Sequence, residues 1–149
     1  MKEKILDAFK TLGFVLEELE GIGYTFEYEG TRCLYMYNEN DEKFLCVTLP
    51  VGLDNNDDDN INYYQVMNKI NSTLKYVKAY MFHEGLWLSY ERELFGDENL
   101  EQILYSMIVH LNVSLSFLRK AIESIDENND DDTEMTNDED FTNNKEDVA

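Results

Sequence analysis

YTFEYEGTRCLYMYNENDEKFLCVTL, residues 24–49, is the segment around which the architecture of the chain is organised. Apolar and polar side chains alternate in three short segments of it, residues 24–28, 32–37 and 43–49, and this is the pattern of strands with one buried face. Turn-forming residues separate the segments: Glu29-Gly30-Thr31 and Asn38-Glu39-Asn40-Asp41. We therefore expect three consecutive antiparallel strands.

The positions of the turns predict which side chains share a face. A three-residue first turn pairs Phe26 with Leu34, and the second turn pairs Cys33 with Cys46. Because side chains alternate across a sheet, one face is expected to be core. It comprises Tyr24, Phe26, Leu34, Met36, Leu45, Val47 and Leu49. The other face is polar and rich in tyrosine, and it comprises Thr25, Glu27, Tyr35, Tyr37, Phe44 and Thr48.

Periodicity predicts the remaining elements. Helices are expected over residues 2–12, 62–74 and 97–125, and strands over residues 14–19, 76–82 and 86–93, with an acidic loop over residues 54–60. The chain is therefore expected to be α+β, with an antiparallel sheet of five or six strands and three helices in the order α-β(3-4)-α-β-β-α. Residues 1–125 are interpreted as a single globular domain.

The acidic character is strongest at the end of the sequence. Residues 126–149 contain eleven acidic side chains and one lysine, and they are expected to form a disordered acidic tail. The whole sequence has 32 acidic and 12 basic side chains, a net charge of −20, which argues against nucleic acid and anionic membranes as partners. With no long apolar segment, the protein is expected to be cytoplasmic, with its two cysteines reduced.

The sequence contains no recognisable constellation for catalysis or metal binding. The acidic residues 54–59 and 130–135 lack the glycine and glutamate positions of an EF-hand loop. His83 and His110 have no partners at metal-ligand spacing, and neither a glycine-rich phosphate loop nor a Gly-x-Ser-x-Gly motif occurs. We therefore expect no enzyme activity, no cofactor and no metal site.

Aromatic side chains are the positive signal for function. In the hairpin predicted over residues 76–93, alternation places Tyr76, Tyr80, Phe82 and Trp87 opposite the aliphatic face. The candidate surface for a partner or a dimer consists of Tyr35, Tyr37, Phe44, Tyr80, Phe82 and Trp87 on the sheet, with Tyr105, Val109, Val113 and Phe117 as a second apolar strip on the last helix. Two interpretations are open: the second helix covers the sheet residues, or they contact another protein.

Four segments and the order of the elements resemble the type III secretion chaperone-like fold and, within it, the YbjN-type family of bacterial proteins. The segments are Ile5-Leu6-Asp7-Ala8-Phe9-Lys10-Thr11-Leu12-Gly13-Phe14, Phe44-Leu45-Cys46-Val47-Thr48-Leu49-Pro50, Met67-Asn68-Lys69-Ile70-Asn71 and Leu86-Trp87-Leu88-Ser89-Tyr90-Glu91. The resemblance implies a small acidic protein, often dimeric. Its secretion chaperones hold a partner polypeptide in extended form, and its YbjN-type members are associated with regulation.

The leading hypothesis is therefore a non-enzymatic protein-binding module, chaperone-like or regulatory, that holds a protein or peptide partner through an exposed aromatic or apolar surface. Strand addition and apolar docking are the two expected modes of binding. The alternatives are a regulatory or structural homodimer and, less favoured by the residues, an enzyme with an unrecognised site.

Overall fold

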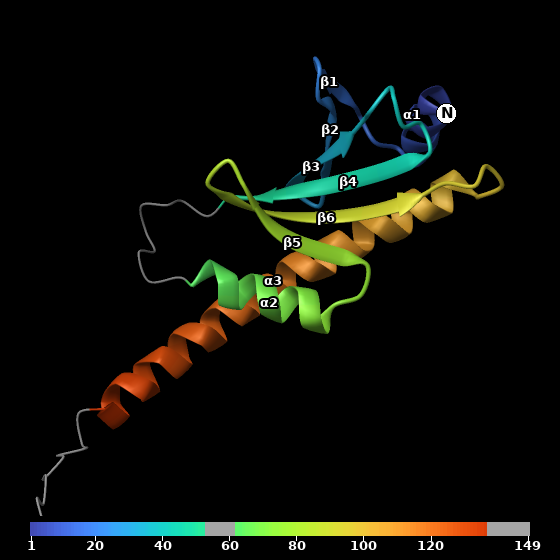
Figure 1. Cartoon of the computed structure of the whole chain (residues 1–149). Coiled ribbons are helices and arrows are strands. Elements are labelled where there is room, and N and C mark those ends of the chain that lie inside the picture. Colours follow the sequence, from blue (N-terminus) through green and yellow to red (C-terminus); the bar gives the residue numbers. More distant parts are fainter. Residues whose placement is uncertain (53–61, 137–149) are drawn as a thin grey trace, which may run out of the picture.

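The computed structural model describes residues 1–52 and 62–136, which contain three helices and a six-stranded antiparallel sheet (Figure 1). Across the sheet the strand order is β1-β2-β3-β4-β6-β5, so β1 and β5 are its edges. The α+β class, the antiparallel sheet and the three helices confirm the prediction. The elements are α1 (Lys2–Thr11), β1 (Glu17–Leu19), β2 (Gly23–Tyr28), β3 (Thr31–Met36), β4 (Phe44–Val51), α2 (Tyr63–Thr73), β5 (Val77–Phe82), β6 (Gly85–Glu93) and α3 (Leu100–Thr136).

One core joins the three helices to the inner face of the sheet. Phe9 of α1 lies against Phe26 and Tyr35, with ring centroids 4.9 and 5.6 Å apart. The helices α2 and α3 add further fully buried side chains to the same cluster: Val66, Ile70, Leu104, Met107, Ile108, Leu111 and Leu118. Burial of this aliphatic and aromatic surface is the main force that holds the helices on the sheet. The helices therefore occupy the inner side, and the opposite face is called the outer face below.

The hairpin between β2 and β3 has a different register from the predicted one. Glu29 and Gly30 have φ angles of 47° and 77°, as a two-residue type I′ turn requires. Phe26 therefore pairs with Cys33, not with Leu34. The prediction was wrong by one residue because Glu29, a non-glycine residue, adopts the left-handed conformation that was assigned to Gly30 alone. A slip of one residue moves every side chain of β3 to the other face.

Tyr35 and Leu34 consequently lie on the opposite faces of the sheet from those predicted. Tyr35 is 1% exposed and belongs to the core, whereas Leu34 and Met36 lie on the outer face, paired with Thr48 and Cys46 of β4. The expected core positions Tyr24, Phe26, Leu45, Val47 and Leu49 do pack in or against the core.

The predicted contact between the two cysteines is also wrong. Cys33 belongs to the core cluster on the inner face, and Cys46 lies on the outer face, where its thiol approaches Ser89. Both thiols are free and buried. Because the sheet separates them, a disulfide between them would require the strands to rearrange.

The hairpin of β5 and β6 keeps its predicted faces although its pairing differs. Its turn is His83-Glu84, both with positive φ, so Met81 pairs with Leu86 rather than Leu88. A shift of two residues along the partner strand preserves the alternation. Val77, Ala79, Leu86 and Leu88 therefore join the core as expected.

The first two helices begin within one residue of their predicted starts, whereas α3 begins at Leu100 instead of residue 97 and ends later than predicted. Its cap is Asn99, whose side-chain oxygen accepts a hydrogen bond from the Gln102 N–H at 3.1 Å. Asn62 caps α2, since its side-chain oxygen accepts a hydrogen bond from the Gln65 N–H at 3.2 Å. The helix α3 continues to Thr136 and runs beyond the sheet in Figure 1, so the first part of the segment expected to be disordered is helical. The rest of that segment, residues 137–149, and the expected acidic loop lie outside the described residues.

Candidate functional site

The outer face of the sheet carries an open groove with a volume of about 1180 Å³. Its sheet side is built by β3, β4, β5 and β6, which contribute Leu34, Met36, Phe44, Cys46, Tyr80, Phe82, Trp87 and Glu91. The lining also includes Leu19 at the end of β1 and Ile22 in the turn that follows, and in Figure 1 the strands β1 and β2 stand above β4. Among the described helices, only α1 reaches the groove, through Lys2.

Aromatic side chains from the β5-β6 hairpin form the most specific part of the lining. The Trp87 indole N–H donates a hydrogen bond to the Phe82 carbonyl oxygen at 3.1 Å, and the two rings meet edge to face with centroids 5.5 Å apart. Phe82 and Phe44 remain 45% and 37% exposed. The indole is thus held in one orientation, and large aromatic surface is available for a contact at low entropic cost.

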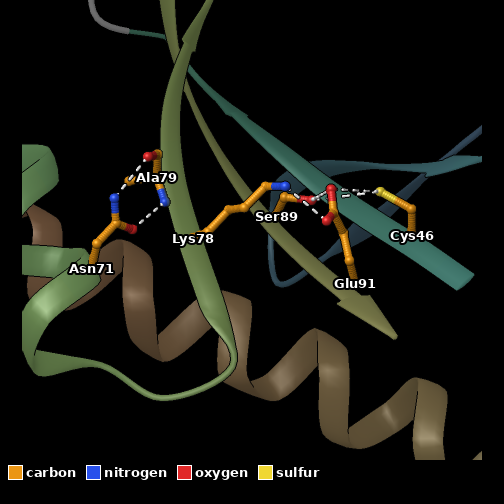
Figure 2. Close-up of polar contacts among 6 residues, drawn as sticks. All are labelled: Cys46, Asn71, Lys78, Ala79, Ser89 and Glu91. Carbon is orange, nitrogen blue, oxygen red and sulfur yellow. Dashed lines mark hydrogen bonds and ion pairs between the residues drawn. The ribbon is translucent and has the colours of Figure 1, made fainter. Parts of the chain in front are cut away.

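A polar network joins Cys46 and Glu91 of the groove lining to Ser89 and Lys78 (Figure 2). The Ser89 hydroxyl donates to Oε1 of Glu91 at 3.3 Å, and Cys46 Sγ lies 3.5 Å from that hydroxyl and 4.0 Å from the same oxygen. Lys78 Nζ donates to Oε2 of Glu91 at 2.8 Å, and this hydrogen bond raises the pKa of the lysine. The network thus surrounds one carboxylate with a thiol, a hydroxyl and an ammonium group.

The surroundings of Cys46 disfavour its thiolate form. Burial is the main reason that the pKa of Cys46 is raised, and the hydrogen bond with Ser89 only opposes it. The nucleophilic form of cysteine is the thiolate, which a raised pKa disfavours at neutral pH. Cys46 therefore contributes a thiol to the groove wall rather than a thiolate.

Four of the six sheet residues proposed from the sequence do gather on the outer face: Phe44, Tyr80, Phe82 and Trp87. Tyr35 does not, because the one-residue shift places it in the core. Tyr37 lies at one end of the groove and also packs against the core, with Lys2 Nζ 4.8 Å from the centre of its ring. Sequence reasoning missed Leu34 and Met36 for the same reason that it misplaced Tyr35.

Tyr76 was also assigned to the wrong side. Its φ of 70° interrupts the alternation just before β5. The ring stacks on Tyr90 with centroids 5.7 Å apart and meets the edge of His110 on α3 at 5.5 Å. Tyr76 therefore lies on the side of the sheet that faces α3, away from the groove.

The second predicted surface, the strip on α3, is separate from the groove. Tyr105 and Val113 are 51% and 58% exposed, Val109 is half-buried, and Phe117 is half-buried against the core. None of the four lines the groove. A contact between this strip and a partner is still a prediction.

The edge of β5 is occupied by a side chain from α2 (Figure 2). Asn71 accepts a hydrogen bond from the Ala79 N–H at 2.7 Å and donates one to the Ala79 carbonyl oxygen at 3.1 Å. One amide side chain therefore satisfies both backbone groups that a neighbouring strand would otherwise use. We call this arrangement the Asn71 clamp.

Metal-binding clusters and membrane-spanning helices are absent from the described part of the chain. Residues 1–52 and 62–136 contain no group of three or more His, Cys, Asp and Glu side chains that could hold a metal ion. No helix within the same ranges is both long and apolar enough to cross a membrane. The sequence matches no protein-family model and no curated protein. The case for a function therefore depends on the groove itself.

Proposed function

We propose that this protein is a non-enzymatic protein-binding module that holds an apolar segment of a protein partner in the outer groove. The observation that carries the proposal is the gathering of six large side chains from four strands on one concave surface: Leu34, Met36, Phe44, Tyr80, Phe82 and Trp87. Concave surfaces with aromatic anchors and a few polar groups are typical of binding sites.

The edges of the sheet favour docking on its face over strand addition. The Asn71 clamp occupies the backbone groups of Ala79 at the centre of β5. At the other edge, β1 has three residues, and the exposed Glu17 and Glu18 are among them. Short strands and edge charges discourage pairing with another strand. The partner is therefore expected to bind mainly through side chains that enter the groove.

The proposal includes the type III secretion chaperone-like fold and the YbjN-type family. Its support is the resemblance of the sequence segments, together with the six antiparallel strands and three helices in the expected order. Holding a partner segment in extended form suits an open groove better than a closed pocket. The role that we propose is accordingly chaperone-like or regulatory.

The test is a selection of random peptides on the full chain, followed by affinity measurements with two matched variants. Trp87→Ser removes an aromatic anchor in the groove, and Tyr105→Ser removes an exposed aromatic ring on α3. We expect the selected peptides to bind the Tyr105→Ser chain normally and the Trp87→Ser chain about tenfold more weakly or worse. Phe44→Ser, a change at a partly exposed ring, is a second groove variant if Trp87→Ser unfolds.

Two results would overturn the proposal. One is that the selected peptides bind both groove variants as tightly as the original chain, although urea unfolding shows that the variants are folded. The other is a dimer, detected by light scattering, that dissociates in both groove variants. A second copy of the chain would then occupy the groove, and the protein would be a homodimer that uses its aromatic residues for self-association.

A further inference from the structure

Glu91 places a carboxylate in the wall of the groove, beside Cys46 and near the ring of Tyr80. Its side chain is 29% exposed and lines the groove, so a bound segment can reach it. Ser89 and Lys78 already hydrogen-bond to its two oxygens and hold the carboxylate in place. A fixed carboxylate among apolar side chains is a specific recognition element, because an apolar segment without a cationic group cannot use it.

Lys78 is a replaceable partner for this carboxylate. Its side chain is 56% exposed, and it projects from the edge strand β5 rather than lining the groove. An exposed ion pair of this kind contributes little to stability, because water competes for both charges and the long side chain loses freedom. A cationic group that binds in the groove can therefore take the place of Lys78 at low cost.

An aromatic ring near the carboxylate favours arginine as that cationic group. The ring of Tyr80 already lies 5.6 Å from Lys78 Nζ, so this ring accepts a cation over its face. A guanidinium group can form two hydrogen bonds with a carboxylate and stack on an aromatic ring at the same time, which an ammonium group cannot.

The charge around the groove points in the same direction. Three glutamates, Glu18, Glu39 and Glu91, line it together with one lysine, Lys2. The whole chain has a net charge of −20. A strongly acidic protein attracts cationic segments and repels acidic ones before contact is made.

We propose that the segment held in the groove is apolar and carries an arginine, whose guanidinium group replaces Lys78 at Glu91 and lies against Tyr80. This inference rests on the proposed function and adds the chemical class of the partner. The groove is thus expected to bind a basic and apolar segment of another protein. Acidic segments and segments without a cationic residue are excluded.

The experiment uses the peptides selected on the full chain. A selected peptide is synthesised with its arginine and with citrulline, which has nearly the same shape but no charge. Both peptides are titrated against the original chain, Glu91→Gln and the control Glu123→Gln, which changes an exposed glutamate on α3. We expect the arginine peptide to bind Glu91→Gln about tenfold more weakly. The citrulline peptide should bind the original chain and Glu91→Gln equally, and Glu123→Gln should change neither affinity.

The outcomes separate this inference from the proposed function. Selected peptides that depend on Trp87 but contain no basic residue would overturn the inference and leave the proposed function intact. The same conclusion would follow if Glu91→Gln, shown by urea unfolding to be folded, bound the arginine peptide as tightly as the original chain does. If no selected peptide depends on Trp87 or Phe44, both proposals are wrong.

Discussion

Replacing Asn71 by alanine should destabilise the protein although Asn71 is an exposed residue. Its amide makes two hydrogen bonds with the backbone of Ala79, at 2.7 and 3.1 Å, and Ala79 itself is 5% exposed. Each such bond contributes about 0.5–1.5 kcal/mol net, and an N–H left without a partner costs more. We therefore expect Asn71→Ala to lower the free energy of unfolding by about 1–3 kcal/mol.

Asn68→Ala is the matched control. Asn68 lies one turn earlier on the exposed side of α2, and both substitutions give the helix the same small gain in propensity. Urea unfolding of the two variants isolates the contribution of the clamp, since a change in midpoint without a change in slope reports stability alone. The Ala79 amide should also exchange its hydrogen faster in Asn71→Ala.

Equal unfolding midpoints for the two variants would refute this reasoning. The Asn71 clamp would then contribute nothing to the free energy of unfolding, and it would give the β5 edge no energetic protection against strand addition. Light scattering gives a second reading of the same variant. An edge released from the clamp can pair with the edge of another copy, so Asn71→Ala should associate more strongly than Asn68→Ala.

Three further predictions concern the core, the thiols and the response to acid. Leu111→Ala should lower the free energy of unfolding in urea by about 2–5 kcal/mol because Leu111 is fully buried. Gln102→Ala should be nearly neutral because Gln102 is exposed on the same helix. Equal losses of stability in the two variants would refute the packing of α3. Burial raises the pKa of Cys33 to about 11, so a thiol reagent at pH 8 should label Cys33 slowly in the folded chain and quickly in urea. Mild oxidation should leave Cys33 and Cys46 unlinked. Rapid labelling of the folded chain would contradict the burial of Cys33, and a disulfide in mass mapping would contradict the placement of the two cysteines on opposite faces of the sheet. Backbone hydrogen bonds from Phe95 and Gly96 hold the pKa of Glu98 below its usual range, so its stabilising effect is present above the unfolded pKa and is lost as pH falls through the folded pKa. Glu98→Gln should therefore lower the melting temperature at pH 7, and the difference from the original chain should diminish in acid. A difference that stays constant with pH would show that the carboxylate charge is not responsible.

The class of fold could be predicted from the sequence, whereas the registers could not: the pairings of β2 with β3, of β3 with β4 and of β5 with β6 all differ from the predicted ones. Strand alternation and helical periodicity are strong signals, and they predicted the number and type of the elements correctly. The turn at Glu29-Gly30 depends on a left-handed glutamate, for which the sequence contains no clear signal. The position of the turn at His83-Glu84 was also predicted wrongly, but there the pairing register shifted by two residues, so the side chains of β5 and β6 kept their predicted faces.

This difference explains which parts of the candidate site were found. Phe82 and Trp87 lie on strands whose alternation was read correctly, and both line the groove. Leu34 belongs to the strand whose faces were inverted, so it was assigned to the core instead. The Asn71 clamp joins a helix to a strand edge through one side chain, and no local pattern predicts a contact of that kind.

The end of α3 shows where composition misled. Residues 126–136 are strongly acidic, and this composition predicted disorder. They continue the helix to Thr136 instead. Aspartate and asparagine are poor helix formers, but a helix that is already formed needs no new nucleus to extend, so acidic composition alone did not determine where the helix ends.

The most direct test of the account is a map of amide chemical shifts in the full chain during titration with a peptide selected on it. A peptide bound in the outer groove should produce the largest chemical-shift changes on the outer face, at residues such as Leu34, Cys46 and Trp87. The amide shifts of the α3 residues Tyr105 and Val113 should be unaffected. Large changes confined to Tyr105 and Val113, with the groove residues unchanged, would contradict the account and would place the binding surface on α3.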